Sequence, residues 1–323
     1  MAASRTGGTV IAPVPANEGE RVPGNAGARE GQTFVGETGF ARWASFVKLP
    51  HTVFALPFAL VGMTIATRLV PITAATVGWA VLAFTCARWV AMAVNRIVDR
   101  EYDAKNPRTA QREIPRGAIA VGEAWVSVVI AAAVFGFAAW MLNPLCFVLS
   151  PVALAWVCFY SFTKRFTRYA HLVLGLGLAI APVGGYLAVT GAWSDPWWVL
   201  IALTVAVMSW SGGFDILYAL PDVAFDRSQA LHSIPAALGV PRAIVVARAL
   251  HGVTVSALAV TVWAIGAGAI AWVGVGIVAA LLTYEHSLVH ADDLRRLDAA
   301  FFTMNGVISM TFLACMLADR VLA

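Results

Sequence analysis

The chain has 323 residues, of which 60% are hydrophobic and only 12% are charged, and its mean hydropathy is +0.77. A soluble domain carries about twice that charged fraction. The composition excludes an ordinary soluble enzyme and predicts an integral membrane protein in a lipid bilayer. The net charge of +4 is explained by membrane topology, and we expect no nucleic-acid partner.

Residues 1–40 differ from the rest of the chain. They are rich in Gly, Ala, Pro, Thr and Glu and contain no apolar stretch, so they lack the apolar region of a signal peptide. Such a segment has too little apolar surface to offset the entropy of ordering its backbone. We therefore predict a disordered cytoplasmic tail over 1–40, followed by one intramembrane domain over 41–323.

A transmembrane helix needs about 20 mostly apolar residues. Runs of this kind predict an all-α membrane bundle of nine helices. The predicted spans are 45–67, 73–96, 119–141, 144–163, 169–189, 196–218, 240–263, 267–285 and 299–319. The 240–263 span is the least regular, because Arg242, Arg248 and His251 lie in its first half.

Basic residues fall on one side of this layout. With a cytoplasmic N-terminus, most Arg and Lys residues lie in or beside four cytoplasmic connections, near 97–118, 164–168, 219–239 and 286–298. The opposite side has only Arg68 and Arg320. This bias obeys the positive-inside rule. We predict a multi-pass protein of the cell (inner) membrane, with its N-terminus and its long polar loops in the cytoplasm.

The first polar cluster lies at the end of the second span. Asn95, Asp99 and Asp103 are spaced by four, so on a helix they form one stripe, and Arg88 precedes them on nearly the same face. Neighbouring carboxylates repel one another unless a cation lies between them. Because Mg²⁺ typically takes one or two carboxylates together with waters and phosphate oxygens, the stripe favours a Mg²⁺–diphosphate site.

The second polar cluster follows the sixth span. Asp215, Tyr218, Asp222 and Asp226 have spacings of three, four and four, which again is one helical face. The topology puts this cluster on the same side as the first and at similar depth. Two acidic stripes that face one cavity can hold two metal ions or a bridging diphosphate.

A third polar group ends the fourth span, at Tyr160, Ser161, Lys164 and Arg165. Its cations lie on the same predicted side as Arg108 and Arg112, which follow the first cluster. All four cations are candidates to neutralise phosphate charge as a diphosphate leaves.

These motifs resemble those of the UbiA superfamily of intramembrane prenyltransferases. The family's first motif is an Asn followed by Asp at the fourth and eighth positions beyond it, which matches the first cluster. The family's loop signature matches Asn106-Pro107-Arg108-Thr109, and its second motif, Asp-x-x-Tyr-Ala-x-x-Asp-x-x-x-Asp, matches 215–226. The nine-span layout also matches, so the resemblance covers about residues 42–319.

Within that family, the sequence around both motifs looks most like the 4-hydroxybenzoate polyprenyltransferases. More narrowly, Arg96 and the run His232-Ser233-Ile234-Pro235 look like the branch that prenylates 1,4-dihydroxy-6-naphthoate in the futalosine route to menaquinone. Two residues depart from the family pattern, since Pro221 and Ala230 stand where Gln and Gly are expected. We expect Pro221 to bend the helix between Tyr218 and Asp222.

The resemblance implies transfer of a polyprenyl group from polyprenyl diphosphate to a ring carbon of a hydroxyarene carboxylic acid. The acceptor is 1,4-dihydroxy-6-naphthoate or 4-hydroxybenzoate, in the biosynthesis of menaquinone- or ubiquinone-type quinones. The resemblance also implies a Mg²⁺ cofactor, held by Asp99, Asp103, Asp222 and Asp226. The catalytic residues that it implies are Asp215 as base, Lys164 and Arg165 beside the diphosphate, and Tyr160. The candidate substrate-binding residues are Asn95, Arg88, Lys48, Arg108, Arg112, Tyr218 and Ser161, with Arg88 or Lys48 for the acceptor carboxylate.

Two alternatives stay open. The chain is compatible with a member of the same family that uses another acceptor, such as a haem or chlorophyll precursor, with a metal or haem site at His286, His290, Asp292 and Asp293. From a different class, intramembrane Asp residues also occur in cation-coupled transporters. Transporter sites usually lie near the midplane of the bilayer, whereas both clusters here lie at one edge beside cationic loops. That placement favours diphosphate chemistry.

Overall fold

The computed structural model describes residues 38–48, 52–290 and 304–322, and every element in these ranges is a helix. Eight of the described helices are long and apolar enough to cross a membrane. They are α3 (Ala74–Val98), α5 (Val121–Leu142), α6 (Pro144–Thr163), α7 (Ala170–Thr190), α8 (Trp198–Tyr218), α11 (Val240–Ala264), α12 (Ala269–Leu288) and α14 (Asn305–Leu322). A shorter apolar helix, α2 (Thr52–Ala66), completes the predicted all-α bundle of nine.

The boundaries correct the sequence prediction at the first span. The predicted span 45–67 is wrong at its start, because a separate helix, α1 (Gly39–Phe46), precedes α2. The span at 240–263 is confirmed as one continuous helix despite its charged first half. The start predicted for the last span, and all but the last three residues of the predicted tail, lie outside the described residues.

Local sequence explains several helix ends. Pro144 occupies the first turn of α6, where its missing N–H is not needed, and the Asn143 side chain accepts a hydrogen bond from the backbone N–H of Cys146 at 2.9 Å. Gly191 ends α7 with φ 64°, a left-handed conformation that glycine adopts without steric cost. These two signals fix the start of α6 and the end of α7.

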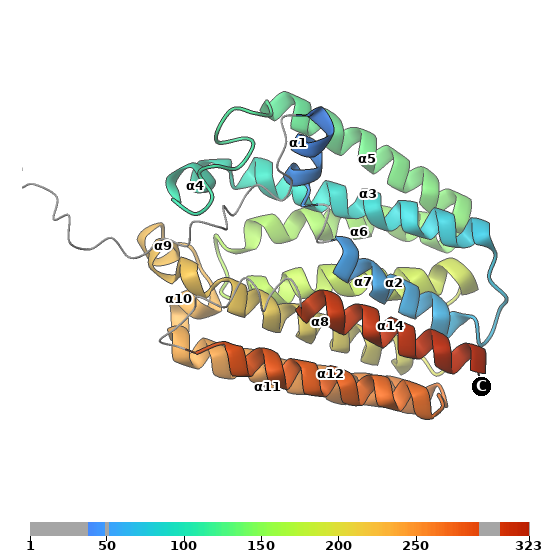
Figure 1. Ribbon diagram of the computed structural model, residues 1–323. Coiled ribbons are helices and arrows are strands. Elements are labelled where there is room, and N and C mark those ends of the chain that lie inside the picture. The colour runs from blue at the N-terminus through green and yellow to red at the C-terminus, as the bar shows by residue number, and fades with distance from the viewer. Residues whose placement is uncertain (1–37, 49–51, 291–303, 323) are drawn as a thin grey trace, which may run out of the picture.

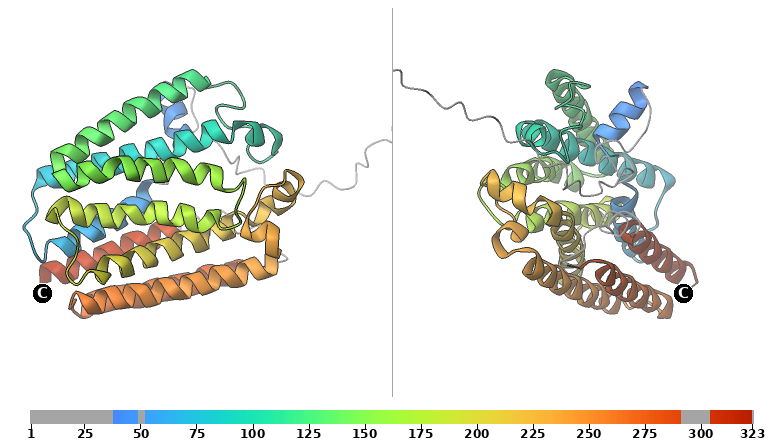
Figure 2. Two further views of the ribbon diagram at one scale, coloured as in Figure 1. Left: turned by 180° about the vertical axis from the view of Figure 1, so that it is seen from behind. Right: turned by 60° about the vertical axis from the view of Figure 1, so that its left-hand side comes forward.

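The helices lie side by side as a bundle, and the short helices gather at one of its ends (Figures 1 and 2). There α4 (Arg100–Lys105), α9 (Val223–Ser228) and α10 (Ile234–Leu238) lie near one another, at the end away from the C-terminus. We call this the polar end, defined by residues 99–118 and 219–239. The bundle thus brings the two predicted polar clusters together.

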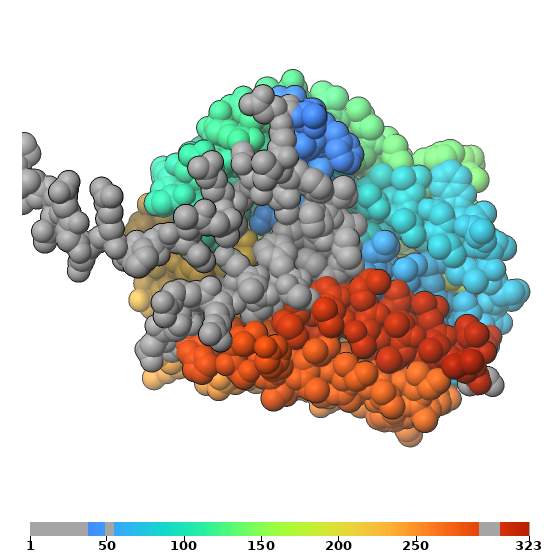
Figure 3. All heavy atoms as spheres, in the orientation of Figure 1, coloured from blue at the N-terminus to red at the C-terminus, as the bar shows by residue number. Residues whose placement is uncertain are grey.

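The main core joins α2, α7, α8, α11, α12 and α14 around Trp210. The Trp210 ring lies 4.8 Å from that of Phe58, and Phe58 lies 6.2 Å from Phe312. Figure 3 shows α14 beside α12 on one face of the molecule, where the two helices pack together. A second core packs α3 and α5 against α1.

Glycines allow α2 and α7 to approach closely. A Cβ added at Gly62 would overlap the carbonyl of Pro182, and one at Gly185 would overlap that of Ala59. Such small-residue contacts are typical of helix packing in membranes. By contrast, Trp140 and Val148 are more than 60% exposed on α5 and α6. Large apolar side chains on the outer surface are expected where helices face lipid.

Candidate active site

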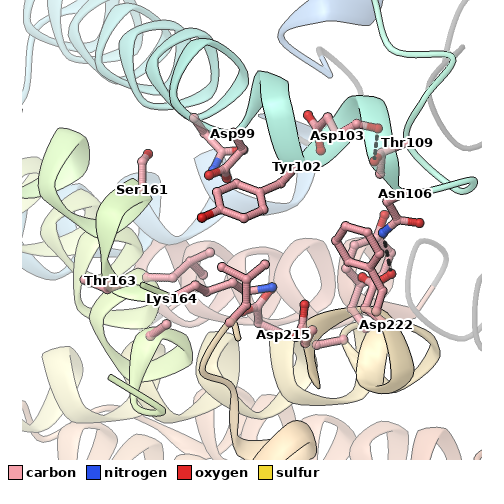
Figure 4. Close-up of a pocket in the computed structure, with 18 of the residues that line it drawn as sticks. Asp99, Tyr102, Asp103, Asn106, Thr109, Ser161, Thr163, Lys164, Asp215 and Asp222 are labelled. Atoms are coloured by element: carbon pink, nitrogen blue, oxygen red, sulfur yellow. Dashed lines mark hydrogen bonds between the residues drawn. The ribbon is translucent and has the colours of Figure 1, made fainter. Parts of the chain in front are cut away.

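A cavity of about 180 Å³ opens at the polar end. Figure 4 shows Asp99 and Asp103 on one side of it, Asp215 and Asp222 on the opposite side, and Lys164 between them. Thirteen of the predicted site residues line it: Asn95, Asp99, Asp103, Arg108, Arg112, Tyr160, Ser161, Lys164, Arg165, Asp215, Tyr218, Asp222 and Asp226. Arg88 and Lys48 are not among its lining residues.

The first wall comes from the end of α3. Asp99 is the C-terminal cap of this helix, and its carboxylate accepts a hydrogen bond from Asn95 Nδ2 at 2.9 Å, as the spacing of four predicts. Arg165 reaches Asp99 Oδ1 at 3.5 Å. Burial, and then the neighbouring Asp103 carboxylate, raise the pKa of Asp99 to about 6. Asp99 is therefore a carboxylate that lacks sufficient nearby positive charge.

Asp103 lies one turn further on, in α4, and is buried. Its Oδ1 accepts a hydrogen bond from Arg112 Nη1 at 2.7 Å, and Thr109 Oγ1 donates to its backbone carbonyl at 3.1 Å. Its Oδ2 is buried and has no hydrogen-bond partner in the described residues. A buried carboxylate oxygen without a partner is costly, and a bound cation would satisfy it.

The second wall begins in α8 and continues in separate short helices. α8 ends at Tyr218, a 3₁₀ helix, η2, covers Leu220–Asp222, and α9 follows. Pro221 lies inside this break, at the position where the sequence predicts a bend. The cluster is therefore carried by three successive helical segments, and not by one continuous helix as the spacing predicted. All of these side chains still line the cavity.

The carboxylates of the second wall are held by the polar end itself. Arg108 makes a two-point ion pair with Asp222, and Asn106 Nδ2 donates to Asp222 Oδ1 at 3.1 Å. Ser233 Oγ donates to Asp226 Oδ2 at 2.8 Å. The turn between these residues contains Ala230, whose φ of 53° is a conformation that favours glycine. Ala230 therefore adopts a strained backbone conformation at the position where Gly is expected from the family pattern.

Lys164 lies between the two walls (Figure 4). Burial lowers its pKa, but Asp226, Asp215, Asp222 and Asp99 together outweigh that effect and raise it above its ordinary value. Lys164 therefore stays protonated. Its position suits a cation that contacts an anionic ligand held between the walls.

Tyr218 lies beneath two cations. Lys48 Nζ hydrogen-bonds to the Tyr218 hydroxyl at 3.3 Å, and the Arg108 guanidinium lies 5.0 Å from the ring centroid. Lys48 thus reaches the edge of the cavity from the end of α1.

Deeper in the bundle, Arg88 and Tyr160 interact electrostatically. Tyr160 also interacts electrostatically with the Asp99 and Asp215 carboxylates. Arg88 Nε is buried without a hydrogen-bond partner among the described residues. The two side chains therefore form a polar extension beneath the carboxylates.

The carboxylates fit Mg²⁺ only as an open site. Among the described residues, no group of three or more His, Cys, Asp or Glu side chains lies close enough to form a metal site alone. Mg²⁺ usually binds one or two carboxylates and completes its shell with waters and substrate phosphates. The pairs Asp99–Asp103 and Asp222–Asp226, on opposite walls, match that requirement.

One contact was missed from the sequence. His171, in the first turn of α7, lies 2.7 Å from Asp215 through its Nδ1. A single His in an apolar helix gives no signal of this pairing, because its partner is 44 residues away.

The structure also bears on the alternative metal or haem site at His286 and His290. His286 hydrogen-bonds to His251 of α11 at 3.0 Å, inside the bundle, and Asp292 and Asp293 lie outside the described residues. The paired His251 is itself buried against the carbonyl of Trp210. The proposed metal or haem site at this position gains no support.

Residues 55–307 match the model of the UbiA prenyltransferase family. The chain belongs to the UbiA prenyltransferase family. Its helices make it a multi-pass membrane protein. The membership favours an enzyme over the cation-coupled transporter.

Curated relatives agree with this membership. The 4-hydroxybenzoate octaprenyltransferase of Alkalilimnicola ehrlichii is 30% identical over 241 residues, which cover 73% of this chain and 80% of the relative. The enzyme of the same name from Azotobacter vinelandii is 31% identical over 211 residues, covering 64% of this chain and 70% of the relative.

Solved structures share the fold. The apo structure of a UbiA homologue from Aeropyrum pernix is 33% identical, covers 83% of this chain and 98% of its own, and superimposes with a TM-score of 0.76. A UbiA homologue from Archaeoglobus fulgidus, bound to DMAPP and Mg²⁺, is 19% identical, with a TM-score of 0.70 and coverage of 87% of this chain and all of its own.

Proposed function

We propose that this UbiA prenyltransferase transfers a polyprenyl group to a ring carbon of an aromatic hydroxy acid, 4-hydroxybenzoate or 1,4-dihydroxy-6-naphthoate, in quinone biosynthesis. The observation that carries the proposal is the cavity with carboxylate pairs on opposite walls and Lys164 between them. The names of the relatives support an aromatic acid as acceptor. The basic residues at the polar end support a cytoplasmic active site.

The donor in this proposal is a polyprenyl diphosphate. Asp99 and Asp103 on one wall, and Asp222 and Asp226 on the other, would hold Mg²⁺, as the homologue bound to DMAPP and Mg²⁺ suggests. When bound, Mg²⁺ supplies positive charge to the diphosphate oxygens. The spare oxygen of Asp103 and the high pKa of Asp99 both favour a cation at the first wall.

The cations that line the cavity bind the diphosphate and stabilise its departure. Lys164 contributes a protonated amine between the walls, and Arg165 lies beside Asp99. Arg108 and Arg112 are paired with Asp222 and with Asp103. When the diphosphate binds, each Arg exchanges its carboxylate partner for phosphate oxygens. The positive guanidinium groups then stabilise the negative charge that develops on the leaving diphosphate.

The acceptor binds beneath the diphosphate. Tyr160 and Ser161 line this part of the cavity, and their side chains interact with each other. Arg88 offers a guanidinium for the acceptor carboxylate, with Lys48 at the opposite edge near Tyr218. The surrounding helices exclude water, which protects an allylic cation from quenching. Asp215 accepts the proton that the ring carbon loses.

The test is product analysis with purified protein in bilayer nanodiscs. The protein is incubated with polyprenyl diphosphates of several lengths and with each acceptor separately, in Mg²⁺ or in EDTA. We expect a product whose mass equals the acceptor plus the prenyl group minus one hydrogen, formed only with Mg²⁺. The absence of product with every aromatic acid would overturn the proposal. A product with only one acceptor assigns the substrate.

A further inference from the structure

The contact between His171 and Asp215 joins a fully buried imidazole to a carboxylate at the cavity. His171 has no exposed side-chain surface, whereas the Asp215 side chain is 21% exposed and lines the cavity. The imidazole Nδ1 lies 2.7 Å from Asp215 Oδ2. His171 therefore stands behind Asp215, on the side away from the ligand.

The backbone packing fixes this arrangement. A Cβ added at Gly212 would press against the Leu172 side chain and the carbonyl of His171. One turn further along α7, a Cβ at Gly175 would overlap the carbonyl of Met208. Glycine at both positions lets α7 and α8 approach closely, and only at such a spacing does the imidazole reach the carboxylate.

The chemistry of the two groups defines the direction of the hydrogen bond. An ionised carboxylate only accepts, so His171 Nδ1 carries the hydrogen and donates it to Oδ2. The other ring nitrogen, Nε2, is buried and has no partner among the described residues. Burying a polar atom without a partner costs free energy. A residue of this kind is expected where it serves the site rather than the core.

We propose that His171 is a positioning residue for Asp215 in the removal of the ring proton. The proposal rests on the proposed function. By holding Oδ2, His171 fixes the plane of the carboxylate and leaves Oδ1 directed to the acceptor. Prenyl transfer then breaks the bond between the prenyl carbon and the diphosphate oxygen, which keeps the electron pair, and forms the new carbon–carbon bond to the ring. Asp215 Oδ1 takes the proton from that ring carbon, and the electron pair of the C–H bond restores the aromatic ring.

Two nearby cations set the electrostatic context for this step. Lys164 and Arg108 both interact with the Asp215 carboxylate across the cavity. Both cations therefore place positive charge near the carboxylate that is proposed to accept the proton. Neither cation fixes the orientation of the carboxylate from behind, where His171 makes the only hydrogen bond that the described residues offer to Asp215 Oδ2.

Three variants separate positioning from simple packing. His171→Asn keeps an amide N–H near the place of Nδ1, whereas His171→Gln puts it near the place of Nε2, away from Asp215. His171→Leu keeps an apolar side chain of similar bulk without a donor. Size-exclusion chromatography and thermal unfolding in detergent report whether each variant folds.

The kinetic readout uses an acceptor with deuterium at the ring position that is prenylated. In the wild type the ring proton leaves quickly after the carbon–carbon bond forms, so the labelled and unlabelled acceptors react equally fast. With a misdirected base, proton removal becomes slow and a primary isotope effect on kcat appears. We expect His171→Leu and His171→Gln to lose about 10- to 100-fold in kcat, less than the roughly 10²–10⁴-fold that a general base contributes in full because Asp215 is still present, with little change in the KM for the diphosphate.

The outcomes distinguish this proposal from the proposed function. Recovery of kcat in His171→Asn, together with an isotope effect in His171→Gln, supports the positioning role. Losses of equal size in all three variants without an isotope effect, or no loss in any of them, overturn it while leaving the prenyl transfer in place. A wild-type protein that prenylates none of the aromatic acids overturns the proposed function, and the role of His171 falls with it.

Discussion

Arg108 and Asp222 form a two-point ion pair that ties the loop after the first cluster to the second cluster. Arg108 Nε donates to Asp222 Oδ1 at 2.9 Å, and Nη2 donates to Oδ2. Asn106 donates to the same Oδ1. Asp222 is thus fully engaged by side chains of the polar end, although it is one of the carboxylates proposed to bind Mg²⁺. Ligand binding at this wall must therefore exchange one charge pairing for another.

The first prediction concerns this exchange. Arg108→Ala frees Asp222, so the affinity for Mn²⁺, a spectroscopic probe for Mg²⁺, should rise when no diphosphate is present. The KM for the diphosphate should rise about 10- to 100-fold, since a hydrogen bond to a charged group is worth roughly 1.5–3 kcal/mol. Electron paramagnetic resonance titration measures the first effect and steady-state kinetics the second.

The control for this variant is Arg100→Ala. Arg100 pairs with the exposed Glu101 at the surface, where an ion pair contributes little. It should leave both quantities unchanged. A weaker Mn²⁺ affinity in Arg108→Ala would show that Arg108 supports the metal site instead of competing with it.

The second prediction tests the two walls separately. Asp99→Ala and Asp222→Ala should each lower kcat by at least about 10²-fold, because each removes a proposed ligand of the Mg²⁺ that would neutralise the bound diphosphate. Both proteins should still fold and insert in the membrane, as judged by size-exclusion chromatography. Glu101→Ala, at an exposed carboxylate between the two Asp residues of the first wall, is the matched control. Full activity in either Asp variant would refute the assignment of that wall.

The sequence was sufficient for contacts within one helix and insufficient for contacts between helices. The bond from Asn95 to Asp99 follows from a spacing of four, because helical periodicity fixes both positions on one face. The pairing of Arg108 with Asp222 spans 114 residues and depends on the loop after Pro107. Periodicity says nothing about the rotation and depth of one helix relative to another. These are set by packing, which also explains why the contact of His171 was missed.

The third prediction tests that packing. Gly175→Ala places a Cβ against the carbonyl of Met208, so α7 and α8 must separate. Overpacking of this kind typically costs about 1–3 kcal/mol. We expect a lower melting temperature in detergent and a lower kcat, since the separation pulls His171 away from Asp215. The control is Gly184→Ala on the same helix, where an added Cβ meets only open space. Equal melting temperatures for the two variants would contradict the close approach.

The fourth prediction concerns the acceptor. Arg88 lies two turns before Asn95 in α3, interacts with Tyr160 and has a buried Nε without a partner in the described residues. If the guanidinium binds the acceptor carboxylate, Arg88→Ala should raise the KM for the aromatic acid about 10- to 100-fold, as expected for the loss of a charge-assisted hydrogen bond. The KM for the diphosphate should change little. Steady-state kinetics with each substrate varied in turn measures both values.

Two comparisons sharpen this last test. Arg88→Lys keeps the charge but loses the planar fork, so it should recover only part of the affinity. A phenol without a carboxylate should bind the wild type and Arg88→Ala equally weakly, because it offers the guanidinium no partner. A larger rise in the KM for the diphosphate than for the acid would instead place Arg88 with the phosphate-binding cations. In that case Lys48, which reaches Tyr218 at 3.3 Å, becomes the residue to test for the acceptor carboxylate.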